Sequence, residues 1–135
     1  MNPVFEDELF TKLATALRSR FSGVYVTGEY INAPSKFPAV FIVEMDNAVN
    51  RAGRDTGGIE HFSDVMYQAD IFSNKNKGKK SECKAIAAFV DEQFAALGFT
   101  RTYLNPVPNM DDATIYRMTG RWIATVGSDN TVYRR

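Results

Sequence analysis

Two residues in this chain have side chains that commonly serve as a nucleophile and a base, Cys83 and His61. Cys83 falls in the first turn of a predicted helix, where the helix dipole lowers the pKa of a thiol. His61 is the only histidine and stands at the start of a predicted strand. Asp64 lies on the opposite face of that strand and cannot orient the imidazole. We therefore expect a surface histidine and an inert or half-buried thiol, with a small enzymatic or ligand-binding domain as the alternative.

Four acidic residues form two pairs that could bind a cation or act as acid and base. Glu44 and Asp46 are predicted to share one face of a strand, and Asp111 adjoins Asp112 in a turn. Neither pair has further oxygen ligands at the spacing of a calcium loop. Nucleotide-binding, zinc-protease and nucleophile-elbow motifs do not occur in the sequence. We expect no catalytic residues, no metal and no cofactor.

Lysines are concentrated in one short stretch, opposed only by Glu82. They are Lys75, Lys77, Lys79, Lys80 and Lys84. Such a cluster could contact phosphates or an acidic protein surface, or it could be a solvated loop that protects a sheet edge. Aromatic residues do not interleave with these lysines, which argues against a single-strand nucleic-acid-binding module. The 16 basic and 16 acidic residues of the chain cancel, and this disfavours a general nucleic-acid-binding protein.

The 135 residues are enough for one domain with its own core, and 44% hydrophobic residues argue against wholesale disorder. One cysteine cannot form an internal disulfide, which fits a reducing cytoplasm. No apolar run is long enough to span a membrane. Acidic residues near the N-terminus, Glu6, Asp7 and Glu8, stand where a signal peptide would be cationic, so we expect no export.

Apolar spacing and turn residues predict two helices and five strands in the order α-β-β-β-α-β-β. The first helix starts at Pro3 and ends at Gly23, and the second is capped by Ser81 and ends at Gly98. Strands are expected at residues 24–30, 39–45, 59–72, 99–104 and 114–126. The intervening turns and loops are expected at residues 32–38, 47–58 and 105–112.

Two long strands alternate between apolar and polar residues, which is typical of a sheet with one buried and one solvated face. The residues expected to face the helices are Val65, Tyr67, Ala69, Ile71, Tyr116, Met118, Trp122, Ala124 and Val126. Those expected to face solvent are Glu60, Asp64, Gln68, Asp70, Arg117, Thr119, Arg121 and Thr125. The sequence therefore predicts an α+β fold, a mostly antiparallel sheet of about five strands packed against two helices. Residues 1–126 would form a single domain and 127–135 a flexible C-terminal tail.

Four segments together resemble a known family. They are Phe37–Glu44 (FPAVFIVE), Tyr67–Asn74 (YQADIFSN), Gly98–Asn109 and Ala113–Arg117 (ATIYR). The chain is similar to the tail terminator proteins of long-tailed bacteriophages, also called tail-to-head joining or tail completion proteins. The resemblance covers nearly the whole chain in length and element order, and it depends on strand patterns and turns rather than on catalytic motifs.

The resemblance implies a structural virion protein that does no covalent chemistry. Family members form a ring, usually of six copies, that caps the head-proximal end of the tail tube and terminates its polymerisation. The implied partners are the major tail tube protein and a head-closure or connector protein. The implied location is the virion neck, after synthesis in the bacterial cytoplasm. Another neck component of similar size, a head-closure or connector adaptor protein, is the alternative.

Partner contacts are expected in the segments free to order on assembly, namely residues 47–58, the lysine-rich stretch and the tail after Val126. The candidate partner-binding residues are Arg51, Arg54, Lys75, Lys77, Lys79, Lys80, Arg134 and Arg135. DNA passes through the lumen of such a ring, so some of these side chains are candidates for non-specific DNA contact. The neutral net charge does not decide which.

Overall fold

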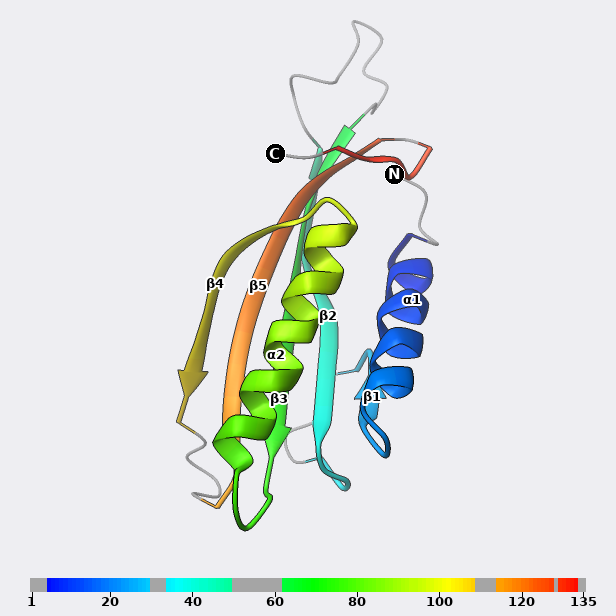
Figure 1. Cartoon of the computed structure of the whole chain (residues 1–135). Coiled ribbons are helices and arrows are strands. Elements are labelled where there is room, and N and C mark those ends of the chain that lie inside the picture. The colour runs from blue at the N-terminus through cyan, green and yellow to red at the C-terminus, as the bar shows by residue number, and fades with distance from the viewer. Residues whose placement is uncertain (1–4, 30–33, 50–61, 109–113, 128, 134–135) are drawn as a thin grey trace, which may run out of the picture.

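The computed structural model describes residues 5–29, 34–49, 62–108, 114–127 and 129–133. The fold is α+β, with two helices over one face of a single sheet (Figure 1). The elements are α1 (Phe5–Arg20), β1 (Tyr25–Thr27), β2 (Ala39–Val49), β3 (Phe62–Ser73), α2 (Lys79–Ala96), β4 (Thr100–Val107), β5 (Tyr116–Gly127) and β6 (Val132–Tyr133). The predicted class and the two helices are confirmed, and the described residues add a sixth strand to the five expected.

The sheet is mixed and, as predicted, mostly antiparallel. Its strands lie in the order β1-β2-β3-β5-β4, and β6 also pairs with β5. β1 runs parallel to β2, while the other pairings are antiparallel. β3 and β5 form the centre and stay in register from the pair Phe62–Gly127 to the pair Ser73–Tyr116. Since β3 occupies one edge of β5 throughout, β4 and β6 share its other edge.

Several strand bounds differ from those predicted. β1 stops at Thr27 because the Thr27 hydroxyl accepts a hydrogen bond from the Glu29 amide at 3.2 Å, which turns the chain. β2 continues to Val49 because it pairs with β3 along its length. β4 runs on to Val107 through Pro106, which an edge strand tolerates. The stretch 127–135, expected to be a flexible tail, instead contains β6.

The predicted end of α2 is confirmed and its predicted start is wrong. Gly98 has a φ of 94°, its amide donates to the Ala95 carbonyl, and the Phe99 amide donates to the Phe94 carbonyl. This is the Schellman arrangement, which satisfies the last helical carbonyls. At the other end the N-cap residue is Gly78 rather than Ser81, and it makes no side-chain cap hydrogen bond.

The core lies between the helices and the sheet. The Phe94 ring stacks on the Trp122 indole with centroids 4.5 Å apart, and Phe99 packs edge-on against Phe94 at 5.2 Å. Gly120 leaves room for this indole, since a Cβ there would lie 2.5 Å from the Trp122 ring. The residues predicted to face inward are confirmed as part of this core: Val65, Tyr67, Ala69, Ile71, Met118, Trp122, Ala124 and Val126 are buried, and Tyr116 is half-buried against them.

The opposite face of the sheet is less solvated than the alternation predicts. Asp70 and Thr119, both expected to face solvent, are only 1% and 5% exposed. Beside them Phe41 and Phe72 form a second, smaller core with ring centroids 5.1 Å apart. The side chains packed over this smaller core are Tyr25, Phe37 and Ile115. Tyr25 of β1 and residues just before β2 and β5 therefore cover one end of a face that has no helix.

Candidate functional site

Cys83 lies in the core rather than at an accessible surface. Its side chain is fully buried, and its Sγ lies 3.3 Å from the Tyr116 carbonyl oxygen and 3.6 Å from that of Ile71. Burial, together with the charge of Glu82, raises the pKa of the Cys83 thiol to about 12. The helix dipole therefore does not produce a thiolate here, because desolvation opposes it more strongly. His61, the base proposed with it, lies outside the described residues.

The Cys83 thiol is expected to resist modification in the native protein. A disulfide reagent applied at pH 8 should react with it far more slowly than with the thiol of the same chain in denaturant, because only the thiolate attacks and little of it forms. Following thiol release by absorbance would measure both rates. Equal rates in the native and denatured protein would contradict the buried, protonated state.

The carboxylates of β2 do not form a pair. The register between β2 and β3 shifts at Met45, so that Glu44 lies opposite Tyr67 while Asp46 lies opposite Met66. Tyr67 and Met66 are consecutive and face opposite sides of the sheet, so Glu44 and Asp46 do as well. The expectation that they share a face is therefore wrong. No group of three His, Cys, Asp or Glu side chains in the described part of the chain is placed to hold a metal ion; Asp111 and Asp112 lie outside it.

Glu44 is instead tied to the core, because it accepts a hydrogen bond of 3.0 Å from the Tyr67 hydroxyl. Burial raises the pKa of Glu44, the Tyr67 hydrogen bond lowers it, and the nearby Glu6 carboxyl raises it again, with a net upward shift. Burial and the charge of Glu44 also raise the pKa of Tyr67. The carboxyl is therefore half-buried and bonded to a core tyrosine.

Glu44→Gln is expected to stabilise the protein near neutral pH. A carboxyl whose pKa is raised by folding holds its proton more tightly in the folded state, so the free energy of unfolding falls as the pH rises above the ordinary value of 4.5. Glutamine stays neutral and can still accept the Tyr67 hydrogen bond. Thermal melts of both proteins should differ at pH 7 and converge near pH 4; a wild-type protein that is the more stable at pH 7 would contradict this.

The lysine-rich stretch lies at the junction between β3 and α2. We call Lys75, Lys77, Lys79, Lys80 and Lys84 the lysine segment. The first two stand in the turn and the others in the first turns of α2, so the expected loop is partly helix. Four of the five are exposed and Lys79 is half-buried. Glu82, the acidic residue among them, accepts a hydrogen bond of 2.6 Å from the Ser73 hydroxyl. The other candidate partner residues, Arg51, Arg54, Arg134 and Arg135, lie outside the described residues.

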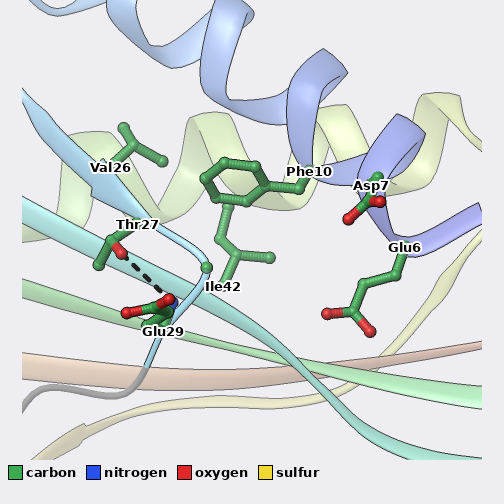
Figure 2. Close-up of a pocket in the computed structure, with 8 residues that line it drawn as sticks. Glu6, Asp7, Phe10, Val26, Thr27, Glu29 and Ile42 are labelled. Carbon is green, nitrogen blue, oxygen red and sulfur yellow. Dashed lines mark hydrogen bonds between the residues drawn. The ribbon is translucent and has the colours of Figure 1, made fainter. Parts of the chain in front are cut away.

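A cavity that the sequence does not reveal lies between α1 and the strands β1 and β2 (Figure 2). It has a volume of about 420 Å³. Its lining residues are Glu6, Asp7, Phe10, Val26, Thr27, Gly28, Glu29 and Ile42. We call it the acidic cavity, because three carboxylates surround an apolar floor. Glu6 and Asp7 stand in the first turn of α1, where the helix dipole favours acidic residues. The packing of α1 on the sheet places Glu29 in the lining of the same cavity.

Polar side chains form a connected network on the sheet face that has no helix. The Arg117 guanidinium donates to the Asp70 carboxylate at 2.8 Å and 3.2 Å, and the Thr119 hydroxyl donates to the same oxygen at 2.5 Å. Gln68 donates to the other Asp70 oxygen at 3.0 Å and accepts a hydrogen bond of 2.8 Å from Arg121. The network holds these side chains in fixed positions.

Neither a scan against protein-family models nor a search of curated proteins returns a match to this chain. Of the two described helices, neither is long and apolar enough to cross a membrane.

Proposed function

We propose that this chain is a structural ring protein in the neck of a long-tailed phage, the tail terminator. It caps the head-proximal end of the tail tube, stops the tube from growing and offers a surface to the head connector. The observation that carries the proposal is the architecture, a single sheet with helices on one face only, whose first seven elements follow the expected order α-β-β-β-α-β-β.

The positions of the residues that were candidates for catalysis support an assembly role. Cys83 is buried and its thiol stays protonated, while Glu44 and Asp46 face opposite sides of the sheet. The most conspicuous charged groups are the lysine segment and the acidic cavity, and both lie at the surface. Charged surfaces of this kind favour association between proteins and set its specificity.

Ring formation has a simple physical requirement. Two different surfaces of the same chain must fit each other, so that copies join head to tail, and the rotation between copies must close. A closed ring then ends a helical tube, because one of its faces matches the tube and the other does not continue the tube lattice. The proposal therefore needs two complementary surfaces on each copy.

The test is tube growth in the presence of the chain. Purified tail tube protein from the same gene cluster would be polymerised with and without it, and tube lengths measured by electron microscopy. We expect shorter tubes, each with added density at one end. Unchanged tube lengths and bare ends would reject the terminator proposal. Binding to the connector instead of the tube would favour the alternative neck role.

A further inference from the structure

We propose that the acidic cavity of one copy receives the lysine segment of a second copy. The inference depends on the proposed ring function and deepens it, because it names the two surfaces that join neighbouring copies. Both surfaces belong to this chain and carry opposite charge.

The cavity has the chemistry that a lysine side chain needs. Its floor is formed by Phe10, Val26 and Ile42, while Asp7 and Glu29 are exposed at its rim (Figure 2). A lysine buries an aliphatic stem against apolar surface and keeps its ammonium group at a polar edge. Ammonium–carboxylate hydrogen bonds are among the stronger ones available at a protein surface.

The lysine segment carries five positive charges, and Glu82 is the one acidic residue within it. Lys79 and Lys80 open α2, where the helix dipole is already positive, and Gly78 provides no side-chain cap. Lys75 and Lys77 add two further charges in the preceding turn. Carboxylates from a neighbouring copy would offset the repulsion among these lysines and between them and the helix dipole, since the first turn of a helix favours anionic groups.

The two surfaces lie in different parts of the molecule. The cavity flanks α1 and the β1 edge of the sheet, whereas the lysine segment surrounds the turn from β3 into α2 at one end of the sheet (Figure 1). A contact between different surfaces of identical chains is heterologous, and its repetition produces a ring or a filament rather than an isolated dimer. The inferred contact is therefore of the kind that a ring requires.

The acidic side is tested with Asp7→Asn combined with Glu29→Gln. Both side chains are exposed, so the variant should fold like the wild type. The matched control combines Glu8→Gln with Glu92→Gln, which removes the same charge from exposed positions outside the cavity lining.

The basic side is tested with Lys75→Gln, Lys77→Gln and Lys80→Gln together. These side chains are exposed as well. Its control combines Lys12→Gln, Arg20→Gln and Lys36→Gln, which removes the same charge from three exposed positions distant in sequence from the segment. Circular dichroism of each variant would establish that it is folded before assembly is measured.

Assembly is measured by native mass spectrometry, with and without tail tube protein. We expect the wild type and both controls to form rings, and each test variant alone to remain a monomer. A mixture of the two test variants should give a one-to-one dimer that does not grow, because only one intact surface of each is left. Rings that persist in either test variant would overturn this inference and leave the ring function standing. A wild type that never associates, alone or at tube ends, would overturn both.

Discussion

Phe94→Ala is expected to lower the free energy of unfolding by about 3–5 kcal/mol. The ring is fully buried, stacks on Trp122 and contacts both Phe99 and Tyr67. Removing it leaves a cavity at the point where α2, β3 and β5 meet, and rigid aromatic neighbours cannot collapse into that space. Since a whole domain is stable by only about 5–15 kcal/mol, the variant should be near the limit of folding.

Urea denaturation followed by Trp122 fluorescence would measure this loss. Phe89→Ala is the matched control, because Phe89 is on the same helix, is only half-buried and packs against Phe21. We expect Phe89→Ala to lower the free energy of unfolding clearly less than Phe94→Ala does. Phe94→Leu keeps the measurement possible if the alanine variant does not fold, with an intermediate loss. Similar losses at positions 94 and 89 would contradict the placement of the core.

Asp70→Ala is expected to cost about 3 kcal/mol, although sequence alternation alone places this residue in solvent. The carboxylate is 1% exposed and accepts hydrogen bonds from Arg117, Thr119 and Gln68. Removing it leaves the Arg117 guanidinium without its partner on a face where solvent access is limited, since the Arg117 side chain is 24% exposed. The expected loss is large because a single partner of a buried ion pair is removed.

A double-mutant cycle with Arg117→Ala would separate the pair from its surroundings. We expect a coupling free energy of more than about 1 kcal/mol between Asp70 and Arg117. The control is Arg101→Ala, since the Arg101–Asp91 ion pair has side chains 49% and 32% exposed and should contribute less than about 1 kcal/mol. A solvated Asp70 would instead give a loss no larger than that of the Arg101 control.

Local patterns predicted much of this fold. The 3.6-residue period placed both helices, and strict alternation identified which residues of β3 and β5 face them. The Gly98–Phe99 pair marked the end of α2, because a left-handed glycine followed by an apolar residue has a specific structural use. These signals depend on neighbours in the sequence and therefore survive without knowledge of the tertiary structure.

The differences between the predicted and the observed structure come from contacts between segments that are distant in the sequence. The parallel alignment of β1 with β2 and the register shift at Met45 are set by partners elsewhere in the chain. Asp70 is bonded to Arg117 and Thr119 of β5, which lie far from it in the sequence. The acidic cavity forms only when α1 packs beside β1. The position of Cys83 in a helical first turn indicates a lowered thiol pKa, whereas its burial in the core raises that pKa.

The proposed function requires that this chain associate with copies of itself at the end of a tail tube. Native mass spectrometry of the 15.1 kDa chain, alone and with tail tube protein, would detect this association. The expected result is a closed species of six copies, either free or recovered bound to tube ends. A chain that stays at the monomer mass in both samples, with no copy on the tube, would contradict it.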